Sequence, residues 1–138
     1  MNFISLPVLY IHLDPIAAPR PRLTRTGLAY MPTAYKVWQR AAVAQLQDQY
    51  SDIPIERNTK IVIEYIFKRP KSLPKRQAKR KAKTSKPDLD NCIKCTLDTL
   101  VRAGVLKDDN IVTEIRSVKV WGAIGDTPHT SISIIHQK

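Results

Sequence analysis

The segment from Pro87 to Gly104 constrains the fold most, because it encodes one amphipathic helix with a recognisable start and end. Apolar residues recur within it at close to helical spacing, at Leu89, Ile93, Leu97 and Leu100. Pro87 favours extended backbone at the residue before it, and Gly104 suits the left-handed position that commonly ends a helix. We therefore expect a helix over Asp90–Ala103 whose apolar face packs against a second layer of structure.

Four other segments are rich in β-branched and aromatic residues, and a fifth has helical periodicity. The predicted strands cover residues 3–13, 60–68, 111–121 and 129–135, and a helix with Thr33 as its N-cap is predicted over 33–50. Pro7 cannot donate to a strand ladder, so we expect the first strand at a sheet edge. The order β-α-β-α-β-β predicts one α+β domain over residues 1–138, with two helices packed on a mixed or antiparallel sheet.

Positive charge dominates the chain, which has 23 Lys and Arg against 12 Asp and Glu and a formal net charge of +11. Much of it lies in two predicted basic loops, residues 14–33 and 68–87. Such a surface favours polyanions, so nucleic acid is the expected partner and a membrane surface the weaker alternative. No apolar run approaches the roughly 20 residues of a spanning helix, and the first residues lack the features of a secretory signal. We therefore expect a cytoplasmic protein with no membrane partner.

Acidic residues follow the second basic loop directly. Asp88 and Asp90 flank Leu89, so extended backbone would turn both carboxylates outward and the leucine inward. Asp108 and Asp109 follow the predicted helix. Neighbouring carboxylates repel one another unless a cation lies between them, and hard oxygen ligands suit Mg²⁺, with Mn²⁺ as a substitute. Acids beside a basic surface thus predict a metal-dependent nuclease.

Residue chemistry alone leaves two alternatives open. Helix capping explains Asp88 and Asp90 about as well as metal binding does. The predicted helix is roughly 20 Å long at ~1.5 Å per residue, so Asp108 and Asp109 start at its far end unless the chain runs back. Lys94 lies one turn after Asp90 and is a candidate for contacting a scissile phosphate.

The motifs occur in a fixed order: Lys86-Pro-Asp-Leu-Asp-Asn-x-x-Lys94, then Leu97-Asp-x-Leu100, then Gly104-x-x-Lys-Asp-Asp109 before a strand. This pattern resembles the RusA family of Holliday-junction resolvases, with the close match over residues 84–121. The resemblance implies a homodimeric endonuclease that resolves four-way DNA junctions by paired symmetric nicks in recombination and repair. It also implies Mg²⁺ or Mn²⁺ as cofactor, no organic cofactor, and a setting that is often a phage genome.

The resemblance assigns roles to individual positions. The family's catalytic residues are matched by Asp88, Asp90, Asp109 and Lys94. The three aspartates are expected to bind the metal, with Asp108 as an additional ligand. The expected DNA contacts are Lys83, Lys86, Arg20 and Arg22. The two arginines match only by rough position, because enteric members carry a Pro- and Asn-rich turn where this chain has Pro-Arg-Pro-Arg.

Rival interpretations remain. A non-catalytic DNA-binding module explains the charge, but not acids placed where they repel phosphate unless a cation intervenes. Cys92 and Cys95 form a C-x-x-C pair, so a thiol redox or zinc role is a weaker alternative to simple packing. An RNA-directed nuclease lacks the support of an RNP-type aromatic motif. His12, His129 and His136 have no nucleophile suggested as a partner, so we assign them no catalysis.

Overall fold

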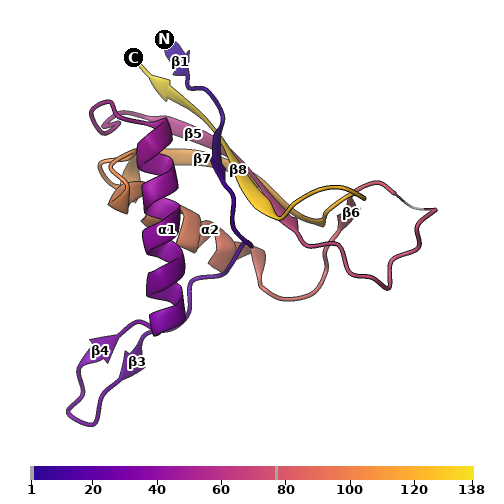
Figure 1. The fold of residues 1–138 in the computed structure, drawn as a ribbon. Coiled ribbons are helices and arrows are strands. Elements are labelled where there is room, and N and C mark those ends of the chain that lie inside the picture. Colours follow the sequence, from indigo (N-terminus) through magenta and orange to yellow (C-terminus); the bar gives the residue numbers. More distant parts are fainter. Residues whose placement is uncertain (1, 77) are drawn as a thin grey trace.

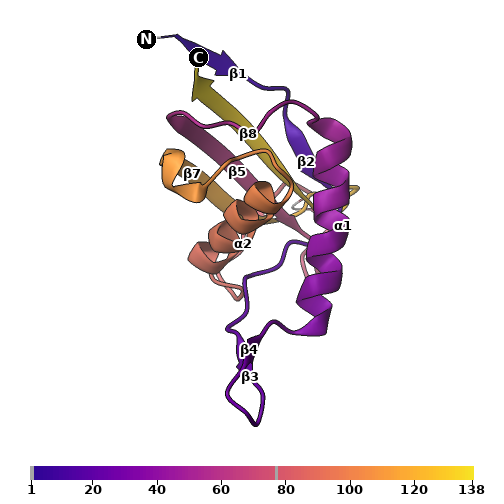
Figure 2. The same cartoon turned by 90° about the vertical axis from the view of Figure 1, so that its left-hand side faces the viewer.

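A six-stranded mixed sheet carries two helices on one face in the computed structural model, which describes residues 2–76 and 78–138 (Figures 1 and 2). The strands of this sheet are β1 (Phe3–Ser5), β2 (Leu9–Ile11), β5 (Thr59–Phe67), β6 (Lys81–Ala82), β7 (Val112–Trp121) and β8 (His129–Gln137). The helices are α1 (Thr33–Gln49) and α2 (Leu89–Arg102). The predicted α+β class and the β-α-β-α-β-β order of the main elements are confirmed.

β5 is the central strand. It pairs parallel with β7 on one side and antiparallel with β8 on the other, so the sheet is mixed. Its alternate residues Ile61, Ile63 and Tyr65 are buried beneath the helices, while Val62 on the opposite face is 43% exposed. This alternation is typical of a sheet with one covered and one open face.

The first 30 residues differ in detail from the prediction. The strand expected over residues 3–13 is two short strands, β1 and β2, which lie on either side of Pro7 and both pair with β8. The predicted edge position is confirmed. The loop expected over 14–33 contains a hairpin, β3 (Arg22–Leu23) and β4 (Ala29–Tyr30), which projects from the body (Figure 1). Gly27, with φ of 85°, permits its tight turn.

Both predicted helices are confirmed, with shifted starts. Pro32 rather than Thr33 occupies the N-cap position of α1, with φ −56° and ψ 142°. α2 begins one residue earlier than predicted, and Gly104 follows it with φ of 78°. The hydroxyl groups of Tyr65 on β5 and Thr96 on α2 are 2.7 Å apart in the interior. In the part of the chain that the structure describes, no helix is both long enough and apolar enough to cross a membrane.

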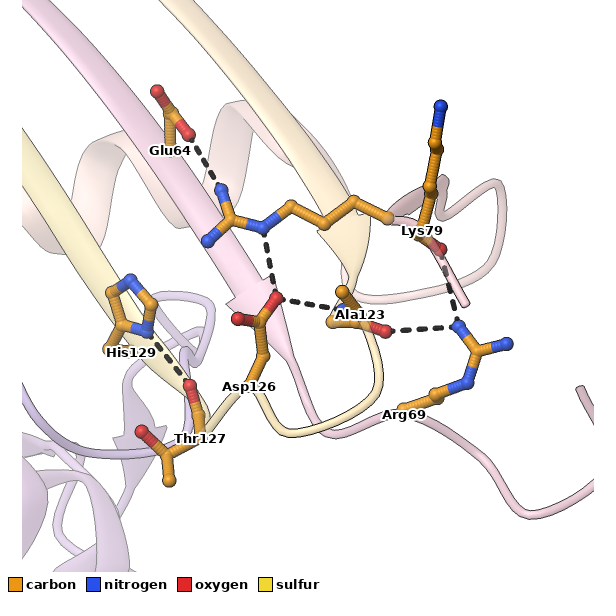
Figure 3. A network of polar contacts seen from close by, with 9 residues as sticks. Glu64, Arg69, Lys79, Ala123, Asp126, Thr127 and His129 are labelled. Carbon is orange, nitrogen blue, oxygen red and sulfur yellow. Dashed lines mark hydrogen bonds and ion pairs between the residues drawn. The ribbon is translucent and has the colours of Figure 1, made fainter. Parts of the chain in front are cut away.

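Arginine side chains hold the basic loop 68–87 against the end of the sheet (Figure 3). Arg80 forms ion pairs with Glu64 (3.2 Å) and Asp126 (3.0 Å). Arg69 donates to the carbonyl oxygens of Pro74, Lys79 and Gly122. The described residues after Pro74 form turns and the short strand β6, as expected of a loop.

Candidate active site

The acid pair lies where α2 begins, between the β3–β4 hairpin and the basic loop (Figure 1). Asp88 is the N-cap residue, with extended backbone at φ −68° and ψ 140°, and Asp90 lies in the first turn. Both residues are exposed. Within residues 78–138, which the structure describes without a gap, the Asp88 carboxylate accepts no capping hydrogen bond from α2. Helix capping therefore does not account for Asp88.

Two lysines fix the backbone that leads to Asp88. The Lys119 ammonium on β7 donates to the carbonyl oxygens of Ser85 (2.6 Å) and Pro87 (2.7 Å). The Lys83 ammonium donates to both oxygens of Ser85, at 3.1 Å and 2.9 Å, and to the carbonyl oxygen of Lys86. We call Lys83 and Lys119 the lysine clamp. Sequence reasoning missed the role of Lys119, because nothing in a strand pattern indicates which loop a side chain will reach.

Lys83, one of the predicted DNA contacts, is largely buried. It is only 6% exposed, and its ammonium lies 4.9 Å from the ring centre of Phe67 and 4.6 Å from that of Trp121. Burial lowers the pKa of Lys83, and the nearby charge of Lys119 lowers it further. The ammonium therefore faces the aromatic rings and the loop carbonyls, and its role as a DNA contact stays a prediction.

The other predicted residues near the acid pair are exposed. Lys94 lies on the same helix one turn after Asp90, and Lys86 lies in the loop just before Asp88. The segment that leads to Arg20 and Arg22 is tied to α2 by a hydrogen bond from the Ala18 N–H to the Asn91 carbonyl oxygen, 3.0 Å. The two arginines are themselves exposed. Cations thus lie on two segments that lead to or from the start of α2, with Lys86 directly before it and Arg20 and Arg22 shortly after Ala18.

Asp108 and Asp109 lie at the other end of α2. They precede β7, at the start of a short 3-10 helix, η1 (Asp109–Ile111), which contacts α2. α2 runs antiparallel to β7, since Lys119 near the end of β7 binds the loop before α2, while Leu106 after α2 bridges to Ile55 just before β5. The lengths of both elements put about 20 Å between Asp109 and Asp88.

The four predicted metal ligands are therefore divided into two pairs within one chain. Among residues 2–76 and 78–138, no three His, Cys, Asp or Glu side chains are gathered where they could hold a metal ion. A hydrogen bond between the Asp108 and Asp109 side chains raises the pKa of Asp109, and their mutual repulsion and the charge of Asp98 on α2 raise it further. The same hydrogen bond lowers the pKa of Asp108.

The remaining candidates have structural partners. Asp98 accepts a hydrogen bond from Gln39 (2.8 Å) and pairs with Arg102 (3.4 Å). Cys92 and Cys95 are free thiols, buried where α2 packs on the sheet. Burial raises the pKa of both, that of Cys95 to about 11, which leaves little thiolate for redox chemistry or zinc binding. Their position supports the packing interpretation of the C-x-x-C pair.

Similarity to known proteins indicates the family to which a chain with this site belongs. The family model described as endodeoxyribonuclease RusA matches residues 12–135, nearly the whole chain. The chain belongs to the RusA family. A crossover junction endodeoxyribonuclease RusA from Aquifex aeolicus (strain VF5) is similar to it, with 29% identity over 93 residues. That alignment covers 67% of this chain and 63% of the relative.

The RusA match places both acid pairs and both basic loops within one family domain, because all the predicted site residues lie between positions 12 and 135. The resemblance drawn from the motifs is therefore confirmed. The roles of individual residues within it remain predictions.

Proposed function

We propose that this RusA family chain is a divalent-metal-dependent endonuclease that cuts four-way DNA junctions by paired nicks on opposed strands, inside the cell. The observation that carries the proposal is the exposed pair Asp88 and Asp90. The lysine clamp fixes the backbone before it, no capping role occupies Asp88, and two basic loops flank it. Paired nicks need two equivalent sites, so we also propose that the chain acts as a homodimer.

The donor chemistry of the acid pair suits a hard cation. Mg²⁺ is commonly held by one or two carboxylates together with substrate phosphate and water, which Asp88 and Asp90 can provide. Mn²⁺ accepts the same oxygen ligands. A bound ion would polarise a phosphodiester oxygen and lower the pKa of an attacking water. Asp108 and Asp109 lie at the other end of α2. Within one chain they therefore do not complete the predicted ligand set around Asp88 and Asp90.

The surrounding side chains bind and orient the substrate in this proposal. Lys94 contacts the scissile phosphate, since it lies one helical turn from Asp90 and is exposed. Lys86 and the two arginines Arg20 and Arg22 hold the DNA backbone on either side. The N-terminus of α2 adds partial positive charge that favours a phosphate at this position.

The test compares a labelled four-way junction with a linear duplex of the same sequence, each with Mg²⁺ and with EDTA. We expect symmetric nicking of the junction that depends on the metal. Asp90→Asn should lower the rate by about 10²–10³-fold or more, the scale on which a preorganised charge at a reacting phosphate contributes. The matched control is Asp48→Asn, an exposed aspartate on α1 away from the acid pair.

Binding separates this proposal from the non-catalytic alternative. Asp90→Asn should bind the junction in EDTA at least as tightly as the wild type, because it removes an anion from a phosphate site. Wild-type protein that binds junctions tightly but cuts under no divalent metal would favour the DNA-binding module. Cutting by Asp90→Asn at the wild-type rate would remove the acid pair from the mechanism.

A further inference from the structure

The β3–β4 hairpin presents two leucines to solvent. Leu23 and Leu28 have 70% and 69% of their surface exposed, and Tyr30 beside them has 42%. Residues 20–31, all of which the structure describes, contribute no side chain to the apolar core. The hairpin forms a two-stranded sheet of its own and projects from the body in both views (Figures 1 and 2). Large apolar side chains gathered on a projecting segment indicate a binding surface.

Hydrogen bonds at the tip of the hairpin hold both leucines in place. Thr24 donates its N–H to the Leu28 carbonyl oxygen (2.9 Å), and its hydroxyl accepts from the Leu28 N–H (3.0 Å). The Thr24 carbonyl oxygen accepts from the Gly27 N–H (3.0 Å), and Gly27 has the left-handed conformation with φ of 85°. A three-residue turn closed in this way suits a hairpin. The two leucines flank this turn, so the turn sets their relative position.

The two leucines lie on opposite faces of the hairpin. Successive side chains of a strand point to opposite faces, and Leu23 lies across from Ala29 whereas Arg22 lies across from Tyr30. Leu23 and Ala29 therefore make one face, and Leu28 shares the other face with Tyr30. A thin element with apolar side chains on both faces fits a narrow gap whose two walls are both apolar.

The charge of the hairpin decides what such a gap can belong to. Arg20, Arg22 and Arg25 are exposed on this segment, and no acidic residue occurs in the sequence between Asp14 and Asp48. The occupant should therefore be a polyanion that also offers flat apolar surfaces. Base pairs between two phosphate backbones combine both properties, and several DNA-binding proteins insert leucine or another apolar side chain between base steps.

The hairpin begins beside the acid pair. The Ala18 N–H donates to the Asn91 carbonyl oxygen (3.0 Å), and Asn91 directly follows Asp90 in α2. From Ala18 to Arg25 the chain spans at most about 23 Å, at ~3.3 Å per residue. That length corresponds to roughly seven base-pair steps of ~3.4 Å. DNA with a phosphate at the acid pair is thus within reach of the tip.

We propose that the hairpin inserts Leu23 and Leu28 between base pairs at the branch point of a DNA junction. Insertion into an intact duplex must break continuous stacking, which costs free energy. At a branch point the stacking between arms is already interrupted, so less stacking has to be broken. The two leucines thereby make the chain prefer branched DNA to a linear duplex. This inference rests on the proposed function, because it concerns how the same site selects its substrate.

The fluorescence of 2-aminopurine tests the insertion directly. The fluorescent base is placed next to the branch point of a synthetic four-way junction, or in the middle of an arm. Wild-type protein is added to saturation in EDTA, so that no cutting occurs. We expect the fluorescence at the branch point to rise by about twofold or more, because the base loses a stacked neighbour, and the arm probe to stay unchanged. No rise at the branch point would overturn the proposal.

Substitution of the leucines should remove that signal. The double variant with Leu23→Ala and Leu28→Ala should lose most of the rise at saturation, whereas Leu28→Met, which stays apolar, should keep it. Ile53→Ala is the matched control, because Ile53 is 78% exposed and follows the far end of α1. All these side chains are exposed, so the free energy of unfolding in urea should not change. A double variant that still unstacks the branch-point base would show that the leucines do not enter the junction.

Relative affinity separates insertion from phosphate contact. In EDTA the double leucine variant should bind the junction about tenfold more weakly than the wild type does, but the linear duplex equally well. Its salt slope should not change, because no phosphate contact is lost. Arg25→Gln should weaken binding to both DNAs and make the slope shallower by about 0.9. Equal loss of junction and duplex affinity in the leucine variant would overturn branch selection by the hairpin.

The turn itself is tested at Thr24. Thr24→Val removes the hydroxyl that accepts from the Leu28 N–H but keeps both leucines. It should weaken junction binding by about threefold, because the tip is less well held, and Thr24→Ser should bind as the wild type does. Junction binding by Thr24→Val at the wild-type affinity would overturn the role given to the turn.

Failure of this inference and failure of the proposed function are distinguishable. If the wild type cuts no junction under any divalent metal, the proposed function fails, while unstacking in EDTA still decides whether the hairpin enters the branch point. Vesicles of anionic phospholipid are the second probe, because exposed leucines and arginines also suit a membrane surface. Vesicle binding that depends on both leucines, without unstacking of the junction, would assign the hairpin to a membrane and overturn the proposal.

Discussion

Lys119 supports the acid pair without belonging to it. Its ammonium joins the end of β7 to the carbonyl oxygens of Ser85 and Pro87, the last residues before Asp88. Hydrogen bonds from a charged donor contribute about 1.5–3 kcal/mol each, and the loop they hold has no regular secondary structure of its own. The position of Asp88 therefore depends on a side chain from a strand more than thirty residues later.

Lys119→Met tests this dependence by removing the ammonium while keeping an unbranched apolar stem. We expect the free energy of unfolding in urea to fall by about 2 kcal/mol, because the carbonyl groups of Ser85 and Pro87 lose their charged donor. Junction nicking should fall further than stability alone explains, since Asp88 is no longer held. Lys79→Met is the control, because the Lys79 side chain extends away from the loop contacts (Figure 3). Equal effects of the two substitutions would argue against a specific role for Lys119.

The burial of the Cys95 thiol predicts how its rate of alkylation depends on pH. Its pKa, raised by burial to about 11, leaves about a hundredfold less thiolate at pH 8 than an ordinary pKa of 9.0 would. Native protein should therefore react with iodoacetamide more than about a hundredfold slower than protein in urea. The native rate should increase as the pH rises toward 11, because the thiolate fraction increases. Rapid labelling at pH 8 without unfolding would revive the redox interpretation of the C-x-x-C pair.

At the scale of elements, one buried hydrogen bond links α2 to the central strand. The Thr96 hydroxyl donates to the Cys92 carbonyl oxygen (3.1 Å), so its contact with the Tyr65 hydroxyl must be one in which Tyr65 donates. Both side chains are almost fully buried. The two partners are therefore unequal: Thr96 has a second hydrogen bond within α2, and Tyr65 depends on Thr96.

This inequality predicts different costs for removing each partner. Tyr65→Phe leaves Thr96 bonded within α2 and should lower the free energy of unfolding by about 1 kcal/mol. Thr96→Val leaves a buried tyrosine hydroxyl without an acceptor and should cost more, about 2–3 kcal/mol. Urea unfolding of the two single variants and of the double variant measures both. A larger cost for Tyr65→Phe would reverse the assigned direction of the hydrogen bond.

The sequence predicted the elements whose periodicity reports their own packing. The alternation in 60–68 and the apolar spacing after Pro87 each follow from contacts with the core, and both elements formed where expected. The β3–β4 hairpin was missed because its two-residue strands are exposed and carry no such pattern. The length of the predicted helix indicated that Asp109 starts far from Asp88, but whether the chain runs back depends on β7 pairing parallel with β5, a long-range choice that no local residue pattern encodes.

At the scale of the whole molecule, the net charge of +11 is not all available to DNA. Arg69 and Arg80 hold the basic loop to the sheet, and Lys83 is buried in the lysine clamp. Arg20 and Arg22, by contrast, are exposed on the segment that follows the hydrogen bond between Ala18 and α2. Counting charge along the sequence therefore overstates how many cations are free on the surface.

The salt dependence of junction binding distinguishes exposed cations that bind phosphate from cations whose charge is used within the fold. Each phosphate contact contributes about −0.9 to the slope of log K against log salt concentration, because a counterion is released. Arg22→Gln, measured in EDTA so that no cutting occurs, should make the slope shallower by about 0.9 and leave stability unchanged. Lys83→Met should leave the slope unchanged while lowering the free energy of unfolding, because its ammonium binds loop carbonyls rather than phosphate. A shallower slope for folded Lys83→Met would show that this lysine leaves its buried position when DNA binds, and would support the predicted DNA contact.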